Sequence, residues 1–536
     1  MDHNNEKIIE ILSTYENLDN IEEFECGVKF KLFDVDYAMT FFNDMSFPSI
    51  LVVDDTSRYP HFSLKEVTFN EHTYKSICLF EEGMLIEYLY SSEDKISLCI
   101  ERLISLVKMS RNEVLKEYHK EFLVYWNAQC VTKGQYGQYK YSLFLDNDLD
   151  FQWLEQQVFK NKTIRITKHD RFFNDASDMY SVQTAPVLFL PIIDSRELWP
   201  PLPTSMWGQD QIKDIIQGKK YQRISSAAYD EIKNKEYHKK EIFLIFKLNN
   251  YCFGCMVKFA DSHKEPLLTK IKQQIVSVIP LMIHRCDHNY LNEQIGNNVS
   301  DKKVAIIGAG SLGSYVADGL VHAGYKNLLV IDHDKFQHDN TFRHRVAWFA
   351  NDYCKSFCVA TTLNGIHPEI NVQFIDEYLN ESNYKQILLE NNVDIVIFTV
   401  GSSDIQLRMN KKFAQDHIEI PIYYSWLEHD GQTSHVAIIN DFDEGCFECL
   451  YTDDKGDFCE NKANKADKST IRYIRNGCGG TRVPYGNKTL LTSSATILRA
   501  LNDKKSGNWL YTYCNDQITV NEYPKNSRCK NCGIRR

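Results

Sequence analysis

The chain has 536 residues, a formal net charge of −11 at pH 7, and 43% hydrophobic and 25% charged residues. This length exceeds what one hydrophobic core usually serves, so we expect two to four domains of ordinary globular protein. The net negative charge repels a phosphate backbone and argues against nucleic acid as a partner. The longest apolar runs, such as residues 187–193, are far shorter than the roughly 20 residues that span a bilayer, and the N-terminus lacks the apolar core of a signal peptide. The sequence therefore predicts a cytoplasmic protein with no membrane partner.

The first part of the chain, residues 1–126, has the pattern of a small α/β domain. Strand-like runs at 49–53, 67–69 and 76–80 precede a periodic run that extends from residue 96 to about residue 126. In that run, apolar residues recur at three- and four-residue spacing, which predicts one apolar helix face. The residues on that face are Ile96, Cys99, Ile100, Leu103, Ile104 and Val107.

The rest of the chain divides into an irregular middle part and a regular last part. Residues 127–283 are rich in tyrosine, with strand-like runs at 186–193 and 242–246, and we interpret them as a linker domain whose fold the sequence does not reveal. From there, in residues 284–536, the runs VAIIGAG, NLLVID, INVQFID and DIVIFTV alternate with helical patterns. Such alternation is typical of a parallel sheet flanked by helices.

A Gly-rich turn follows the first of these strands. Residues 304–313 read VAIIGAGSLG, a strand that ends in the turn of Gly308, Gly310 and Gly313 and opens a helix, where backbone N–H groups and the helix dipole favour phosphate. Asp332 ends the next strand and is placed to bond a ribose hydroxyl. The pattern predicts nucleotide binding, but it would suit a nicotinamide dehydrogenase equally well.

The residues that follow distinguish these reactions. Residues 328–346 read LLVIDHDKFQHDNTFRHRV, and the sequence DYCK ends at Lys355. This stretch resembles the LxDxDxVxxxNxxRQ motif and following lysine of the ThiF, MoeB and ubiquitin-activating family. The resemblance implies adenylation of a carboxylate with ATP and Mg²⁺, a reaction that depends mostly on positioning and electrostatics. It assigns Asp332 and Asp334 to the nucleotide, Asn340 and Arg343 to the phosphates, and Lys355 to the charge that develops at the α-phosphate.

One position departs from this family. The family usually follows its next strand with Thr-Asp-Asn, whose aspartate helps to hold Mg²⁺, whereas this chain has VGSSD at 400–404. Counting back from Arg408 puts Ser403 where the aspartate belongs. We assign the metal role to Asp404, one position along; the alternative is that Asp404 is the N-cap of the following helix.

The sixteen cysteines are expected to be metal ligands, nucleophiles or small core residues, because a reducing compartment disfavours disulfides. Two CxxC pairs supply four thiolates for a structural Zn²⁺: Cys446 with Cys449, and Cys529 with Cys532. The resemblance implies the same assignment, since distant CxxC pairs tie the chain end to the adenylation domain in this family. A third pair, Cys252 and Cys255, lies in a strand-like run, which favours core packing over metal binding.

A further cysteine lies between the zinc pairs, in the sequence NGCGG at 476–480. Glycines around Cys478 leave room for an acyl group, and a following helix could lower the pKa of the thiol if its start lies close. In the family, a cysteine between a mobile loop and such a helix accepts the adenylated carboxyl group. We therefore expect Cys478 to be the nucleophile of the activating domain, with Cys459, inside the charged loop 452–470, as the alternative.

The N-terminal domain carries another candidate thiol. Tyr59-Pro60-His61 is followed by a strand-like run and by Ile77-Cys78-Leu79 before the predicted helix. This order resembles the ubiquitin-conjugating fold, so Cys78 would be the transfer cysteine; the alternative is a buried strand residue. The usual His-Pro-Asn is missing, and Asn70 is a possible substitute.

Taken in order, these domains resemble bacterial fusions of a ubiquitin-conjugating-like domain with a ThiF-like activating domain, as in anti-phage CBASS operons. The resemblance implies an enzyme that activates the C-terminus of a partner cyclic-nucleotide synthase of CD-NTase type and joins it to a target amine, and it implies a homodimer. A ubiquitin-like protein as substrate stays open, as do a sulfur-carrier adenylyltransferase and a non-catalytic scaffold.

Overall fold

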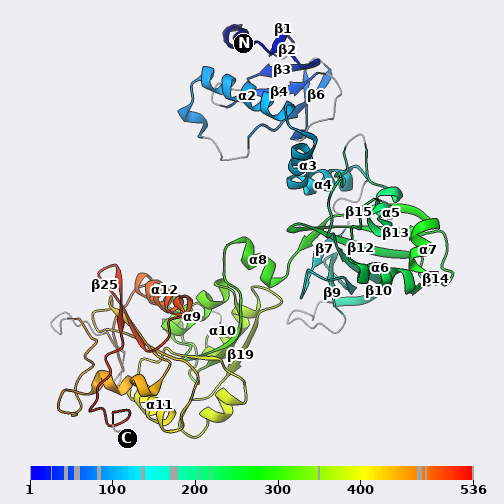
Figure 1. Cartoon of the computed structure of the whole chain (residues 1–536). Coiled ribbons are helices and arrows are strands. Elements are labelled where there is room, and N and C mark those ends of the chain that lie inside the picture. The colour runs from blue at the N-terminus through cyan, green and yellow to red at the C-terminus, as the bar shows by residue number, and fades with distance from the viewer. Residues whose placement is uncertain are drawn as a thin grey trace. The chain divides into compact units, whose positions relative to one another are not determined.

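The computed structural model describes all residues except 1, 26, 42–45, 54–60, 70, 81–85, 134–138, 169–178, 203–204, 219, 348–349, 467–473, 477–479 and 534–536. The chain forms two compact units, one that runs to Arg285 and one that begins at Cys286 (Figure 1). Within the described part of the chain, every helix is too short or too polar to cross a membrane.

The first unit begins with a six-stranded antiparallel sheet of order β1-β2-β3-β4-β6-β5. Helices α1 (Asp2–Leu12) and α2 (Ser92–Val107) pack against it around an apolar core that includes Phe30, Ile50 and Ile96. The strands are β1 (Leu18–Phe24), β2 (Gly27–Leu32), β3 (Val35–Thr40), β4 (Ser49–Val52), β5 (Phe62–Phe69) and β6 (His72–Ile77). The runs predicted at 49–53, 67–69 and 76–80 overlap β4, β5 and β6.

The periodic run from residue 96 to residue 126 forms three helices instead of one. After α2 the chain continues as α3 (Arg111–Lys120) and α4 (Phe122–Thr132). The first break has a local cause, because the Ser110 side chain accepts the Glu113 N–H and the Glu113 carboxylate accepts the Ser110 N–H. This capping box starts a new helix at Arg111.

The rest of the first unit is built on an eight-stranded sheet of order β15-β13-β12-β10-β8-β9-β7-β16. Helices α4, α5 (Gln209–Gln217), α6 (Ser226–Asn234) and α7 (Leu267–Gln273) contribute to one of its cores, in which Trp126, Trp207 and Phe253 pack ring against ring. Cys252 and Cys255 lie in two different apolar clusters, as core packing requires. The strands are β7 (Lys140–Leu143), β8 (Gln152–Phe159), β9 (Thr163–Thr167), β10 (Met179–Pro191), β12 (Glu241–Leu248), β13 (Tyr251–Phe259), β15 (Ile275–Leu281) and β16 (Ile283–Arg285).

The second unit has a sheet of order β19-β18-β17-β20-β21-β22-β25-β26, in which β19 to β21 are parallel and the remaining pairings are antiparallel. The predicted α/β class with a parallel sheet is thus confirmed for this unit. The strands are β17 (Ser300–Ile307), β18 (Tyr325–Ile331), β19 (Asn371–Ile375), β20 (Ile395–Phe398), β21 (Ile422–Leu427), β22 (Ser434–Ile439), β25 (Trp509–Cys514) and β26 (Gln517–Glu522).

Helices cover both faces of this sheet, and each face has its own core. On one face lie α9 (Ser311–His322), α10 (Lys355–Asn364) and α12 (Asn487–Asp503), and on the other lies α11 (Ser403–Gln415). After β17 the chain adds β18 and β19 on one side of β17 in the sheet, and it then crosses over to add β20 on the other side of β17. In such sheets, ligands bind outside the carboxyl ends of the strands where the strand order reverses. The fold therefore directs attention to the ends of β17, β18 and β20.

Candidate nucleotide and thiol sites

A cavity of about 260 Å³ lies at the predicted edge of the sheet in the second unit. The turn after β17, the end of β18 and the turn after β20 line it, together with the first residue of α10. Its lining includes Gly308, Gly310, Asp332, Asp334 and Lys355. The structure thus brings together five of the residues that the sequence assigned to the nucleotide.

The Gly-rich turn depends on close packing between its two ends. Gly308 has a left-handed φ of +97°, which favours glycine. A Cβ at Gly313 would lie 1.8 Å from the Gly308 carbonyl oxygen, so only glycine fits the start of α9 against the turn. At Gly310 a Cβ would meet nothing within 4 Å, which leaves open space at the point where the helix begins. Such a turn can present backbone N–H groups to a phosphate.

The backbone of Ala309, at the centre of the turn, is hydrogen-bonded at both its N–H and its carbonyl group. The Asp332 Oδ2 atom accepts the Ala309 N–H at 2.6 Å, and the His344 Nε2 atom donates to the Ala309 carbonyl oxygen at 2.6 Å. Burial raises the pKa of Asp332 and lowers the pKa of His344 to about 4, so His344 is neutral at physiological pH and carries its proton on Nε2. Each carboxylate oxygen has two lone pairs, which leaves Asp332 able to accept from a ribose hydroxyl as well.

His344 is a residue that the sequence interpretation missed. It stands directly after Arg343, where the family motif has glutamine, and its side chain is 6% exposed with its ring edge against Phe336. A lone histidine carries no spacing signal, so only its position in the fold reveals the contact with Ala309. The motif comparison could have found it, because the glutamine-to-histidine change keeps a donor at that position.

Lys355 lies in a charged cluster at the cavity wall. The Lys355 Nζ atom is 2.8 Å from Asp334 Oδ2, and the backbone N–H of Lys355 donates to the backbone carbonyl of Asp334. His333 Nε2 lies 3.0 Å from the other Asp334 oxygen, and its ring stacks on Tyr378. One ligand atom from each of Asp332, His333 and Asp334 lies within 4.8 Å of the others, so this group has the donor types and spacing for a divalent cation.

Arg343 and Asn340 lie beside the turn, outside the lining of the cavity. The Arg343 Nη1 atom donates to Ser311 Oγ at 3.0 Å at the start of α9, and its Nε atom is buried with no hydrogen-bond partner in the described part of the chain. Asn340 is 5% exposed, and its side chain accepts the Gln337 N–H. Arg343 therefore offers an unused donor beside the helix terminus, which an anion could accept.

Asp404 is outside this cavity. Its side chain is 71% exposed and pairs with Arg408 Nε at 3.0 Å, one turn along α11. The N-cap of this helix is Ser402, which lines the cavity, and Ser403 Oγ is hydrogen-bonded to the Tyr451 hydroxyl. The Asp332–His333–Asp334 group thus lies closer to the proposed nucleotide than the Asp404 carboxylate does, although a metal role for either stays a prediction.

The four cysteines of the two CxxC pairs come together in the second unit. All four are buried, and one Sγ atom from each lies within 4.8 Å of the others. The Cys446 and Cys529 sulfurs are 3.8 Å apart, and those of Cys449 and Cys532 are 3.3 Å apart. These separations are far longer than a disulfide of about 2.05 Å, and they approach the edge of roughly 3.8 Å that a tetrahedron with Zn–S bonds of 2.3 Å requires. The residues present therefore fit a structural Zn²⁺.

The charged segment predicted as a long loop packs against the second unit over residues 452–466. The buried Glu428 carboxylate accepts the N–H groups of Lys465 and Ala466 and also bonds His435 Nε2 at 2.6 Å. Burial opposes ionisation of Glu428, but these hydrogen bonds outweigh it and lower its pKa. Cys459 is half-buried, and its N–H donates to the Tyr451 carbonyl. Cys478 lies outside the described residues; β23 (Ile474–Asn476) and β24 (Gly480–Arg482), on either side of it in the sequence, pair antiparallel.

Cys78 is exposed and lies directly after β6. Its N–H donates to the His61 carbonyl oxygen at 2.6 Å, and its Sγ atom is 3.5 Å from the Phe80 carbonyl oxygen. The alternative of a buried strand residue does not describe this position. Tyr59, Pro60 and Asn70, which entered the comparison with ubiquitin-conjugating domains, lie outside the described residues.

His61 anchors the Cys78 backbone to the junction of α3 and α4. His61 has a left-handed φ of 69°, a costly conformation for a non-glycine residue that the surrounding contacts must maintain. Its ring nitrogens lie 2.8 Å from Glu121 Oε1 and 3.2 Å from Glu117 Oε2, and its N–H donates to Glu121 Oε2. Burial lowers the pKa of His61, but the hydrogen bonds and charges of the two carboxylates outweigh burial and raise it. No spacing in the sequence indicates this cluster, because His61 precedes Glu117 by 56 residues and Glu121 by 60.

The second unit therefore combines a Rossmann-type sheet, a Gly-rich turn and a four-cysteine cluster. Residues 290–530 match the model of the ThiF family, so this unit contains a ThiF family domain.

Relatives of known name extend the comparison. The ATP-dependent ubiquitin transferase-like protein Cap2 of Pseudomonas aeruginosa is 20% identical over 430 residues, which cover 76% of this chain and 74% of that protein. The ubiquitin-like modifier-activating enzyme 5 of Drosophila simulans is 26% identical over 164 residues, which cover 28% of this chain and 39% of that enzyme. The chain is thus homologous to ubiquitin-activating and ubiquitin transferase-like proteins. Escherichia coli MccB aligns over 46% of this chain and 69% of its own at 17% identity, with a TM-score of 0.35.

We predict one Zn²⁺ per chain in protein purified without chelator. Cys449→Ser should remove the metal, because the three remaining thiolates bind it less tightly. It should also lower the thermal unfolding midpoint of the second unit, because residues 529–532 are then no longer linked to residues 446–449 through the metal. Elemental analysis measures the metal, and Cys354→Ser, at a cysteine outside the cluster, is the control. Protein without zinc, or a Cys449→Ser protein that retains a full equivalent, would contradict the assignment.

We also predict that Glu121→Gln loosens the backbone at Cys78 in a pH-dependent way. A raised pKa means that protonated His61 contributes stability below its ordinary pKa of 6.5, and that this contribution is lost as the pH rises through the folded value. The ratio of amide exchange rates at Cys78, variant over wild type, should therefore be greatest below pH 6.5 and fall toward one at higher pH. Hydrogen exchange with mass spectrometry measures this ratio.

Glu93→Gln is the matched control for this experiment, since Glu93 also forms an ion pair in the same unit, with Lys7 at 3.2 Å. That variant should leave exchange at Cys78 unchanged. A ratio for Glu121→Gln that does not vary with pH would show that His61 does not hold Cys78 through its charge.

Proposed function

We propose that this protein adenylates the C-terminus of a partner protein with ATP, holds it as a thioester on Cys478, transfers it to Cys78 and joins it to a target amine. The observation that carries the proposal is the cluster of Lys355, Asp334 and Asp332 beside an open Gly-rich turn at the carboxyl edge of the sheet. Homology to a ubiquitin transferase-like protein over 76% of the chain supports it.

In the first step, an oxygen of the partner's terminal carboxylate attacks the α-phosphorus of ATP, and pyrophosphate leaves. Lys355 and Arg343 are cations that can offset the negative charge that develops on the phosphate oxygens. Mg²⁺, when bound, would neutralise phosphate charge in the same way; we assign it to Asp404 from the sequence, with the Asp332–His333–Asp334 group as the alternative. Asp332 and His344 together fix the Ala309 peptide, so the turn meets the phosphates without first rearranging.

Two thiol transfers follow in the proposal. The Cys478 thiolate attacks the acyl carbon of the adenylate and AMP leaves; the Cys78 thiolate then attacks the thioester and Cys478 leaves as thiolate. An amine of the target finally displaces Cys78. The exposure of Cys78 supports this assignment, because a transfer cysteine must be reached by both a second thiol and an amine.

For the substrate, we propose a cyclic-nucleotide synthase of CD-NTase type in anti-phage defence, with a ubiquitin-like protein as the alternative; the resemblance to bacterial fusion proteins supports this choice. A cytoplasmic homodimer belongs to the same proposal. A sulfur-carrier adenylyltransferase would use Lys355 and the zinc cluster but would not need Cys78, so the thiol experiment below distinguishes it.

We predict that Lys355→Ala and Arg343→Ala each lower ATP–pyrophosphate exchange on the order of 10²-fold or more, since each removes a cation from the transition state. The exchange assay contains the partner's C-terminal peptide, and circular dichroism checks that the fold is retained. Lys335→Ala, which removes a lysine outside the cavity lining, is the control. Near-normal exchange in either variant would exclude that residue from the chemistry.

We predict that the thiols act in the order Cys478 and then Cys78. Cys478→Ala should still form the adenylate but charge neither cysteine, and Cys78→Ala should accumulate a thiol-sensitive adduct on Cys478 and give no amide product. Non-reducing gels and mass spectrometry of the adducts measure these species. Efficient charging of Cys78 in the Cys478→Ala protein would overturn the relay and favour direct transfer or passage through Cys459.

A further inference from the structure

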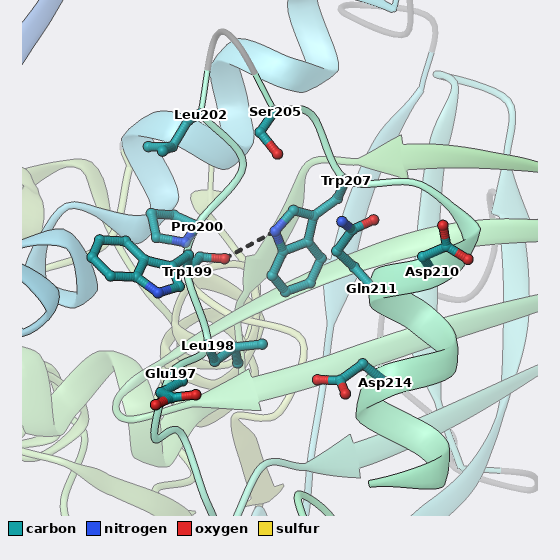
Figure 2. Close-up of a pocket in the computed structure, with 10 residues that line it drawn as sticks. All are labelled: Glu197, Leu198, Trp199, Pro200, Leu202, Ser205, Trp207, Asp210, Gln211 and Asp214. Carbon is teal, nitrogen blue, oxygen red and sulfur yellow. Dashed lines mark hydrogen bonds between the residues drawn. The ribbon is translucent and has the colours of Figure 1, made fainter. Parts of the chain in front are cut away.

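A second cavity, of about 400 Å³, lies in the first unit and is lined by residues 197–200, 202, 205 and 207 and by helix α5 (Figure 2). One part of its lining is apolar and consists mainly of Leu198, Trp199, Pro200 and Trp207. The other part carries the carboxylates of Glu197, Asp210 and Asp214. Neither the nucleotide site nor either thiol site includes any of these residues.

The apolar wall is fixed before any ligand arrives. Trp207 is 2% exposed, and its indole Nε1–H donates to the Trp199 carbonyl at 3.0 Å, as the dashed line in Figure 2 marks. The Gln129 side chain bonds both the N–H and the carbonyl of Trp207, at 3.0 and 2.8 Å. Since little ordering remains for binding to impose, a ligand at this wall would lose less entropy than at a mobile surface.

Glu197, which lines this cavity, has a strained backbone conformation. Its φ is 56°, in the left-handed region that glutamate rarely adopts. The nearly buried Arg223 guanidinium donates from Nη1 to the carbonyl of Arg196 at 2.8 Å and thereby secures this turn. Strain that the surroundings maintain is a common feature of binding sites.

The charges of the lining favour a cation. Among the described residues that line the cavity, three are carboxylates and none is a lysine or arginine. Lys220 pairs with Glu197 at 2.9 Å and Arg223 pairs with Asp214 at 2.9 Å, both from outside the lining. Asp210, in the first turn of α5, is exposed and has no ion pair or hydrogen bond to any described residue. The Asp210 carboxylate would repel a phosphate and attract a cation.

The aromatic wall adds a preference among cations. The Arg111 guanidinium lies 6.0 Å from the centroid of the Trp199 ring, so one face of this indole already carries a planar cation of the chain and only the remaining surface of the ring can meet a ligand. Indole faces bind guanidinium through both cation–π attraction and stacking, whereas an ammonium ion gains only the former.

We propose that this cavity binds a cationic side chain of a partner protein, arginine in preference to lysine, with its charge at Asp210 and its stem against the tryptophan wall. This inference goes beyond the proposed activity and does not depend on ATP or on either thiol. A site of this kind would recruit a basic segment of a partner protein.

The test uses the full chain labelled with 5-fluorotryptophan. Its seven tryptophans give separate fluorine NMR signals, and the signal that is lost in Trp199→Phe is assigned to Trp199. The probes are the capped tripeptides Gly-Arg-Gly and Gly-Lys-Gly, with the citrulline tripeptide as a neutral probe of the same shape as arginine. We expect the arginine peptide to shift the Trp199 signal at millimolar concentration, the lysine peptide to bind more weakly and the citrulline peptide to give no shift. Asp210→Asn should weaken arginine binding roughly fivefold, the size of one partly exposed ion pair.

Asp230→Asn is the control, because Asp230 is an exposed aspartate in α6 of the same unit that does not line this cavity. It should bind the arginine peptide as the wild type does. Equal shifts with the citrulline peptide, unchanged binding in Asp210→Asn, or no shift of Trp199 with any peptide would each overturn the proposal.

Discussion

The candidate nucleotide site depends on how the backbone of Ala309 is held. Its N–H is accepted by Asp332 and its carbonyl is bonded by His344, while Gly313 approaches the neighbouring Gly308 carbonyl so closely that no side chain fits. These contacts join β17, the end of β18 and the segment before α10 into one rigid turn. A turn held in this way can present its N–H groups without paying for reorganisation, which is the main contribution that a protein makes to phosphate chemistry.

The charged residues around the cavity, Asp332, Asp334 and Lys355, differ in exposure and in hydrogen-bond partners. Asp332 is half-buried, and its burial raises its pKa, whereas Asp334 is exposed at the cavity wall and bonded to Lys355. Lys355 is held by Asp334 through both its side chain and its N–H. Binding of ATP would place phosphate near this pair and give Lys355 a second anion to compensate. Lys355 could then pair with Asp334 in the ground state and stabilise the phosphate charge more strongly in the transition state.

Three other anchors hold backbone in segments that contain or lead to cysteines. The four-cysteine cluster links residues 446–449 to the end of the chain, and Glu428 holds Lys465 and Ala466, the last described residues before the segment that leads to Cys478. In the first unit, His61 ties the Cys78 backbone to Glu117 and Glu121. His61 thus fixes the backbone next to the exposed Cys78 through residues far away in the sequence.

Local spacing in the sequence was enough to predict several of the regular elements and motifs. Strand and helix periodicity predicted the parallel sheet, the run from Gly308 to Gly313 predicted the turn, and the CxxC spacing predicted the cysteine cluster, because each pattern follows from the geometry of one or two adjacent elements. The sequence could not foresee the break at Ser110 as part of a long periodic run, since the capping box competes with the continued helix. The packed structure was needed to show that His344 supports Ala309 and that Trp199, Trp207 and Asp210 share a cavity. The physical reason is the same for all of these: the contacts join separate elements whose meeting depends on how the whole chain packs, and no fixed spacing in the sequence encodes it.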